Sequence, residues 1–137
     1  MSVRFDLPAP DFDTQAWWDA TAEHRLLVKR CGSCGRAHFY PRPFCPHCWS
    51  ADVHWETATG AATLYTYSIV RVNDLPPFPE RVPYVAAVVE LAEGPRMMTN
   101  VVDCELDALE IGMALAVQFR DVGDDVTIPV FAPAGPA

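Results

Sequence analysis

Residues 31–48 read CGSCGRAHFYPRPFCPHC and contain two CxxC pairs separated by ten residues. A CxxC turn directs both of its sulfurs toward one point, and two such turns complete the tetrahedral sulfur shell that zinc prefers. The spacing is shorter than that of the commonest zinc ribbons, but it leaves room for a hairpin between the two pairs. The sequence therefore predicts one Zn²⁺ per chain, with four ligands: Cys31, Cys34, Cys45 and Cys48.

The ligand set also indicates what the metal does. Catalytic zinc keeps one coordination position open for water, whereas four thiolates leave none. The metal is therefore expected to be structural, because it stabilises a lobe that has too little hydrophobic core of its own. Two other interpretations stay open here: a rubredoxin-type iron site, and four reduced cysteines without a metal. His38 and His47 lie near the pairs in sequence and are expected at the surface.

The segment before the cysteine pairs predicts a short helix over residues 13–24. Asp13 or Thr14 can cap it, because each offers a side-chain oxygen to a free amide at the helix start. Trp17 and Trp18 are adjacent, so the helix cannot bury both rings against one face. We expect one of the two rings to contact another subunit or the other lobe.

After residue 60 the pattern changes to β-strands separated by turns. Five short antiparallel strands in so few residues fit a small closed barrel, of which the OB-fold is the commonest five-stranded type. The expected strands are Ala61–Val72, Tyr84–Leu91, Pro95–Val102, Met113–Val122 and Val126–Phe131.

Side-chain alternation assigns faces to these strands. In the first strand, Tyr65, Tyr67 and Ile69 are expected on one face, with the even-numbered residues from Leu64 on the other. The second strand is almost wholly apolar, so it is expected to be buried on both faces. Residues 103–111 carry two leucines at helical spacing and are expected to form a short helix that plugs the barrel.

Together these features predict a mainly β protein with an N-terminal helix, in which a rubredoxin-like zinc ribbon precedes a five-stranded OB-fold barrel. Composition supports this division, because five of the ten basic residues fall within residues 25–56. The expected segments are an N-terminal helical segment (1–24), a zinc ribbon (25–58), an OB-fold barrel (59–132) and a tail (133–137).

Length and composition exclude several classes of protein. With 137 residues, half of them apolar, the chain can form one domain, or one domain with a small satellite. The net charge of −8 argues against nucleic acid as a partner. No apolar run approaches the roughly 20 residues that a membrane helix needs, and the first residues lack the apolar stretch of a signal peptide. We therefore expect a cytoplasmic protein that binds neither nucleic acid nor a membrane.

The residues give little support for an independent active site. The sequence contains no nucleophile elbow, paired-histidine motif, P-loop or GxGxxG fingerprint. Cys104 is the one cysteine outside the pairs, and the carboxylates of Asp103 and Glu105 beside it disfavour the thiolate that a nucleophile needs. We therefore expect Cys104 to be structural and the chain to carry no catalytic residue.

The ordered set of motifs resembles a known family. A Trp-Trp helix leads through RLLVKR (25–30) into the cysteine pairs, an aromatic strand follows residue 60, and GDDVTIPVF (123–131) stands near the end. Over about residues 12–132 this is similar to the zinc-ribbon/OB-fold family of acyl-CoA-associated proteins. The resemblance implies the same structural zinc on the four cysteines.

The resemblance also implies a role as a partner of another enzyme. Members of the family accompany thiolase-like proteins, including lipid-transfer-protein-like aldolases, and help to enclose the acyl-CoA. The implied function is a non-catalytic accessory subunit in the retro-aldol cleavage of a β-hydroxyacyl-CoA, of the kind found in steroid side-chain degradation. The alternative is a partner of a thiolase or hydroxymethylglutaryl-CoA synthase-type condensing enzyme. An α2β2 heterotetramer is the simplest symmetric assembly.

No residue-level motif of the family selects the contacts. Basic residues can meet CoA phosphates, and exposed aromatic residues can fill an interface of standard size, about 800 Å² per partner. The candidate phosphate contacts are Arg30, Arg36, Arg42, Arg71 and Arg81. The candidate partner contacts are Trp17, Trp18, Tyr40, Phe44 and Phe78.

Three other classes remain as alternatives at this stage. OB barrels often bind single-stranded nucleic acid, although the net charge of −8 opposes it. A four-cysteine iron site is typical of a rubredoxin-like electron carrier, which colour distinguishes from colourless zinc. A self-sufficient hydrolase or lyase is disfavoured because the catalytic motifs are missing.

Overall fold

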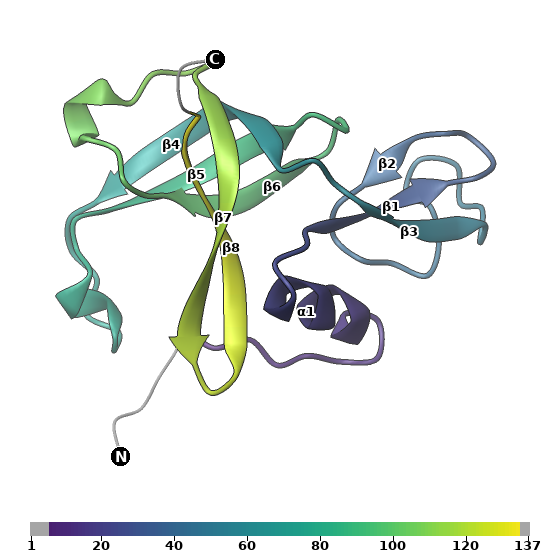
Figure 1. Cartoon of the computed structure of the whole chain (residues 1–137), viewed down its shortest axis with the longest axis horizontal. Helices are drawn as coiled ribbons and strands as arrows, with labels where there is room; N and C mark the ends of the chain where they lie inside the picture. The colour runs from purple at the N-terminus through teal and green to yellow at the C-terminus, as the bar shows by residue number, and fades with distance from the viewer. Residues whose placement is uncertain (1–5, 135–137) are drawn as a thin grey trace.

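The computed structural model describes residues 6–134. These residues form a short helix, a three-stranded sheet and a closed five-stranded barrel. Figure 1 shows the small sheet at one side of the barrel, with helix α1 (Gln15–Ala22) close to both. This arrangement confirms the predicted fold class, which was mainly β with an N-terminal helix, a ribbon and an OB-type barrel.

The small sheet carries the cysteine pairs and is called the ribbon below. Strand β1 lies at its centre and pairs antiparallel with both neighbours, for example Lys29 with His38 and Lys29 with Trp55. The first cysteine pair lies at the β1–β2 turn, and the second lies in the connection to the third strand. The strands of the ribbon are β1 (Leu27–Cys31), β2 (Ala37–His38) and β3 (Val53–Thr57).

The barrel has the strand order β4-β5-β6-β8-β7, and it closes because β4 also pairs with β7. Neighbouring strands are antiparallel except β6 and β8, which run parallel where Val101 meets Phe131. This order is that of an OB-fold. The barrel strands are β4 (Ala61–Val70), β5 (Tyr84–Leu91), β6 (Arg96–Val101), β7 (Ala114–Gly123) and β8 (Val126–Pro133).

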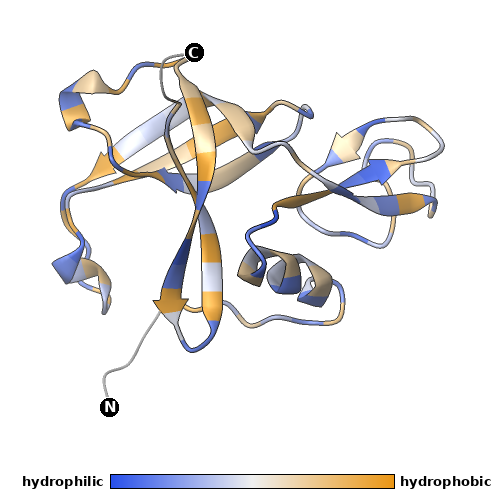
Figure 2. Ribbon diagram, in the orientation of Figure 1, coloured by the Kyte–Doolittle hydropathy of each residue, from blue (hydrophilic) through white to orange (hydrophobic). Residues whose placement is uncertain are grey.

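Alternate residues of the barrel strands form the core. Figure 2 shows apolar and polar residues alternating along β7 and β8, which fits a sheet with one face toward the core. In β5 every second residue from Val85 to Leu91 is buried, but the residues between them are only partly covered. The prediction that this strand is buried on both faces is therefore wrong, because its outer face lies on the barrel surface.

Strand β4 changes face part of the way along. The pairing of β4 with β5 has a bulge between Leu64 and Thr66. Leu64 is buried before the bulge, whereas Tyr67 and Ile69 pack against the core after it. An extra residue in one strand reverses the inward and outward alternation of side chains. The prediction that Leu64 and the odd-numbered residues lie on opposite faces is therefore wrong.

The connection between β6 and β7 is not the plug helix that the leucine spacing predicts. Within residues 103–111 the structure has one short 3₁₀ turn, η2 (Leu106–Ala108), with no buried residue in it. Leu109 follows the turn in extended conformation and is buried in the core. The β4–β5 connection contains a second 3₁₀ turn, η1 (Phe78–Glu80).

Helix α1 packs inside the chain. Trp17 is 7% exposed, and its indole N–H donates to the Leu27 carbonyl at 3.1 Å. Its ring also meets the Phe39 ring edge-on, with 5.7 Å between centroids. Trp18 is half-buried and packs against the core, and the helix also contacts β8 of the barrel. The helix therefore joins the two lobes.

The start of the helix differs from its prediction. The helix begins at Gln15, and Thr14 stands at the N-cap without a side-chain cap hydrogen bond. Instead, the hydroxyl and the backbone N–H of Thr14 both donate to a carboxylate oxygen of Asp11, at 2.9 Å each. Within residues 6–134 no helix is long and apolar enough to cross a membrane.

Gly60 controls the junction between the ribbon and the barrel. Its φ is +87°, and a Cβ at this position would lie 2.5 Å from Cγ1 of Val117. The Val117 amide also donates to the Gly60 carbonyl at 2.9 Å, so the two strands cannot separate freely.

We therefore expect Gly60→Ala to lower the free energy of unfolding by about 2–4 kcal/mol, through both the left-handed backbone and overpacking. Gly112→Ala is the matched control, because Gly112 has φ +89° but open space around a Cβ. The control should lose only about 1–2 kcal/mol. Urea unfolding of both variants tests this, and equal losses would contradict a steric role for Val117.

Candidate metal centre and surrounding surfaces

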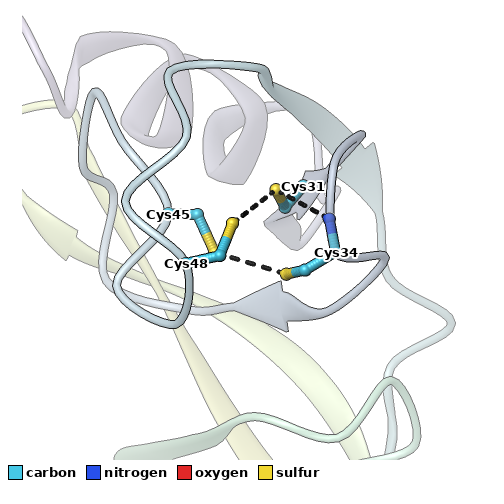
Figure 3. A group of neighbouring side chains, drawn as sticks. All are labelled: Cys31, Cys34, Cys45 and Cys48. Atoms are coloured by element: carbon cyan, nitrogen blue, oxygen red, sulfur yellow. Dashed lines mark hydrogen bonds between the residues drawn. The ribbon is translucent and has the colours of Figure 1, made fainter.

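The four paired cysteines converge on one point. Their Sγ atoms all lie within 4.8 Å of one another, and Figure 3 shows them pointing inward from the two turns. Two of the sulfur–sulfur distances are 3.6 Å (Cys31 to Cys48) and 3.7 Å (Cys34 to Cys45). A tetrahedral zinc with Zn–S bonds of about 2.3 Å requires sulfur–sulfur distances of about 3.8 Å. The side chains are therefore placed for one ion.

Each CxxC turn also directs backbone amides at its first sulfur. The amides of Ser33 and Cys34 donate to the Cys31 sulfur at 3.3 and 3.4 Å, and the His47 amide donates to the Cys45 sulfur at 3.3 Å. Such donors stabilise thiolate charge before a metal arrives. The Cys34 amide in particular lowers the pKa of the Cys31 thiol to about 6.

The thiol of Cys48 holds its proton more tightly than the thiol of Cys31. The Ser50 backbone amide lowers the pKa of Cys48, but burial and the three other sulfurs outweigh it and raise that pKa to about 12. Thiolates this close repel one another unless a cation lies between them. The donor set thus fits a divalent, thiophilic ion, and Zn²⁺ bound here would have four protein ligands and no open position.

The two histidines near the cluster have different environments. His47 is exposed, as predicted, but His38 is buried with 6% of its surface accessible, so its predicted surface position is wrong. Neither belongs to the group of side chains placed to bind the metal. Burial is the largest cause that lowers the pKa of His38, and the nearby side chains of Lys29, His47 and Arg42 lower it further. His38 is therefore neutral near pH 7.

A cleft of about 440 Å³ separates the ribbon from the barrel and is called the interlobe cleft below. Its ribbon wall includes the β1–β2 turn and the second cysteine turn, and its barrel wall is the β5–β6 turn. The polar lining residues are Arg30, Arg36, His38, His47, Glu93 and Arg96. Sequence patterns did not indicate this cleft, because its walls lie about 60 residues apart along the chain.

A larger cavity of about 720 Å³ opens beside η1 and η2, at one end of the barrel. Its floor includes Val85, Val101 and Val130, which are buried core residues. Arg120 and Asp103 form a long ion pair of 3.4 Å at its edge. Cys104 lines it and is half-buried against the core, and its structural role stays a prediction.

The five predicted phosphate-contact arginines lie in different places. Arg30 forms an ion pair with Glu56 at 2.8 Å and donates to the Gly35 carbonyl at 3.0 Å. Arg81 forms an ion pair with Asp6 at 3.1 Å. The other three arginines have exposed side chains: Arg36 beside the interlobe cleft, Arg42 before the second cysteine pair and Arg71 directly after β4.

The aromatic residues predicted to face a partner are also distributed. Trp17 is buried within the chain, and Trp18 and Phe78 are half-buried. Tyr40 is exposed, and its hydroxyl accepts from the Met98 amide at 3.4 Å. The sequence analysis did not select Trp49, which is 75% exposed and stacks on Phe44 with 5.2 Å between centroids. Its position next to a metal ligand was the only signal.

Fold and site together define a zinc-ribbon/OB-fold protein. Residues 18–54 match the family model "ChsH2, rubredoxin-like zinc ribbon domain", and residues 55–120 match "ChsH2, C-terminal OB-fold domain". The chain is 34% identical over 112 residues to a DUF35 domain-containing scaffold protein of Methanocaldococcus jannaschii, covering 81% of this chain and 79% of that protein. The chain belongs to the DUF35 family, and its metal is the zinc of this ribbon.

Two further similarities concern named enzymes. A probable enoyl-CoA hydratase alpha subunit of Thermomonospora curvata is 41% identical over 130 residues, which are 94% of this chain but 40% of that protein. The chain thus spans well under half the length of this relative. A solved structure described as "Ltp2-ChsH2(DUF35) aldolase" superposes with a TM-score of 0.83 at 37% identity, covering 93% of this chain and 98% of that chain.

Loss of one zinc ligand should unfold the ribbon. We expect Cys45→Ser to bind less than about 0.1 zinc per chain at limiting metal and to lose several kcal/mol of stability, because binding energy is folding energy in a small metal lobe. Cys104→Ser is the control and should retain one zinc. Metal analysis by mass spectrometry, with thermal unfolding of the same samples, measures both. A Cys45→Ser protein with a full complement of zinc would contradict the proposed ligand set.

The buried His38 should make stability sensitive to acid. Its pKa is lowered in the folded state, so the unfolded chain binds a proton more readily below the ordinary histidine pKa of about 6.5. Stability is therefore fully present above about pH 6.5 and falls as the pH drops, with a slope of at most about 1.4 kcal/mol per pH unit.

Comparison with His38→Phe isolates this contribution, since acid loss of zinc affects both proteins. We expect wild type to lose more unfolding free energy than His38→Phe between about pH 7.5 and about pH 5.5. Chemical unfolding at both pH values gives the difference. Parallel losses in the two proteins would show that His38 titrates as it does in the unfolded chain.

Proposed function

We propose that this protein is a non-catalytic accessory subunit that binds a thiolase-like or lipid-transfer-protein-like enzyme and helps to form its acyl-CoA site. The observation that carries the proposal is the match to the Ltp2-ChsH2(DUF35) aldolase structure, which covers 98% of that chain at 37% identity. The site chemistry supports it, because within residues 6–134 the one group of side chains placed to hold a metal is a closed four-cysteine set.

The reaction that we propose for the complex is retro-aldol cleavage of a β-hydroxyacyl-CoA, of the kind used in steroid side-chain degradation. The aldolase description of the matched structure supports a carbon–carbon lyase. The alternative is a thiolase or synthase-type condensing complex, and the scaffold name of the Methanocaldococcus jannaschii relative fits a protein-binding role in either complex. In either complex the acid and base residues belong to the partner. The reduced cysteine set is suited to the cytoplasm, where we place the protein.

Exposed aromatic residues supply a surface for the partner. The Phe44–Trp49 stack presents a large, rigid apolar surface beside the second cysteine pair, and Tyr40 adds a third ring on the ribbon. Aromatic side chains are enriched in interfaces because they bury much area at low entropic cost. Trp18 is half-buried on α1, and Phe78 is half-buried beside the larger cavity of the barrel, so Phe78 would form a separate contact with the partner. Trp17 would act by holding α1 in place.

The arginines provide the proposed contacts with CoA phosphates. Arg36, Arg42 and Arg71 have exposed guanidinium groups, and Arg30 and Arg81 keep their charges beside acidic partners. In an α2β2 heterotetramer, which is the simplest closed assembly, each accessory chain would serve one active site.

Capture of the partner tests the proposal. The tagged full-length chain, expressed in its native host, should co-elute with a thiolase-like protein, and the captured complex should cleave a β-hydroxyacyl-CoA. Zinc analysis of the same sample should give one ion per chain. Recovery of this chain without such a protein, or with bound nucleic acid, would overturn the accessory-subunit role.

The ribbon surface gives a quantitative prediction. We expect Trp49→Ala to weaken partner binding by about 2 kcal/mol, roughly 30-fold, because exposed tryptophans in interfaces often dominate the binding energy. Val72→Ala is the control, since Val72 is also exposed but lies on the barrel after β4. Surface plasmon resonance with the captured partner measures both variants, after zinc content shows that each ribbon is intact. Unchanged affinity of Trp49→Ala would place the interface elsewhere.

A further inference from the structure

The interlobe cleft has walls from two lobes that are far apart in sequence. The β5–β6 turn of the barrel faces the ribbon (Figure 1), and this turn contributes Glu93 and Arg96 to the cleft. The ribbon contributes Arg36 and His38 from the β1–β2 region, and His47 from the second cysteine turn. At about 440 Å³ the cleft accommodates a small molecule rather than a folded segment of a partner.

Positive charge gathers around this cleft in a chain whose net charge is −8. Arg36 and Arg96 lie on opposite walls, and within residues 6–134 Arg36 forms no ion pair. The Arg96 guanidinium lies over the Tyr65 ring at 3.8 Å, which orients it without neutralising it. The acidic residue of the cleft is Glu93: its Oε2 accepts a hydrogen bond from the Thr59 amide at 2.9 Å, and its Oε1 is buried without a partner among the described residues. Three arginines of the lining, Arg30, Arg36 and Arg96, outnumber this one carboxylate. The cleft is therefore suited to an anion.

His38 is the residue whose surroundings call for a ligand. It lines the cleft and is 6% exposed, yet neither ring nitrogen has a hydrogen-bond partner within the described part of the chain. Buried polar groups in folded proteins are normally paired, so an unpaired imidazole indicates a missing donor or acceptor. The lysine and arginine side chains that act on it, Lys29 and Arg42, are both cationic. An acceptor that carries negative charge would satisfy both the ring and these neighbours.

We infer that the interlobe cleft binds the phosphate groups of a small organic phosphate, with Arg36 and Arg96 on opposite walls and His38 as the buried donor. A tetrahedral phosphate can accept from both walls and from the imidazole at once, whereas a planar carboxylate presents two oxygens in one plane. Guanidinium forks match phosphate oxygens well. The assignment of coenzyme A as the source of these phosphates rests on the proposed function, but the site itself is inferred from the residues that line the cleft.

Isothermal titration calorimetry of the zinc-loaded full-length chain tests the site without any partner. Inorganic diphosphate is the first probe, and coenzyme A is the second. We expect both to bind, with Arg36→Ala and Arg96→Ala each reducing affinity at least about tenfold, because each variant removes a charged hydrogen bond. Arg25→Ala is the matched control, since Arg25 is an exposed arginine that does not line the cleft and has no proposed role in binding, and it should bind as wild type does.

His38→Phe supplies a second test of the same site. It should also reduce affinity for diphosphate, while His38→Gln, which keeps a donor, should retain more of the affinity than His38→Phe. Far-ultraviolet circular dichroism and zinc content show whether each variant is folded, and the exposed Arg36 variant remains informative if a His38 variant is not.

The outcomes separate this inference from the proposed function. Absence of heat with both probes, or equal weakening by Arg25→Ala and Arg36→Ala, would overturn the cleft as a phosphate site whatever the partner capture shows. Binding of diphosphate with no tighter binding of coenzyme A would support the site and assign it to free phosphates. Binding of both probes that the Arg36→Ala and Arg96→Ala variants weaken, with tighter binding of coenzyme A than of diphosphate, would support the site and its link to coenzyme A.

Discussion

Four thiolate sulfurs within 4.8 Å of one another cannot stay together without a cation, and the rest of the ribbon depends on this constraint. The metal joins two turns that are ten residues apart, and β1 leads directly into the first of them. The ribbon has three short strands and a few buried side chains, so packing alone would not hold it. Trp17 then ties α1 to this metal-held sheet through the Leu27 carbonyl.

The barrel is stable for a different reason, because its closed strand order leaves each strand paired on both sides and encloses an apolar core. The two lobes are linked at Gly60, where the backbone conformation and the lack of a side chain allow β3 to pass into β4 beside Val117. Their junction leaves the interlobe cleft, whose walls carry much of the positive charge near the ribbon. The accessory role that we propose would use such surfaces rather than a reactive group, since the metal is coordinatively closed.

Sequence patterns predicted the local features well. The CxxC spacing indicated the ligand set, and the alternation of apolar residues indicated five strands whose ends lie within two residues of the observed ones. Errors arose where one residue changed the geometry. The bulge in β4 reversed the alternation after Leu64. The leucine spacing after β6 predicted a helix, but the structure has an extended segment with one 3₁₀ turn there. Periodicity describes a regular backbone, so it fails at a bulge.

The sequence by itself determined the metal centre, the order of the lobes and the type of barrel, because these depend on residues that are close in the chain and on periodic patterns. Only the tertiary structure decided which side chains are accessible. It buried His38 between cationic neighbours, stacked Trp49 on Phe44 at the surface and placed Arg36 opposite Arg96. These relationships join distant parts of the chain, and their distances follow from how the ribbon docks on the barrel, which no local pattern records.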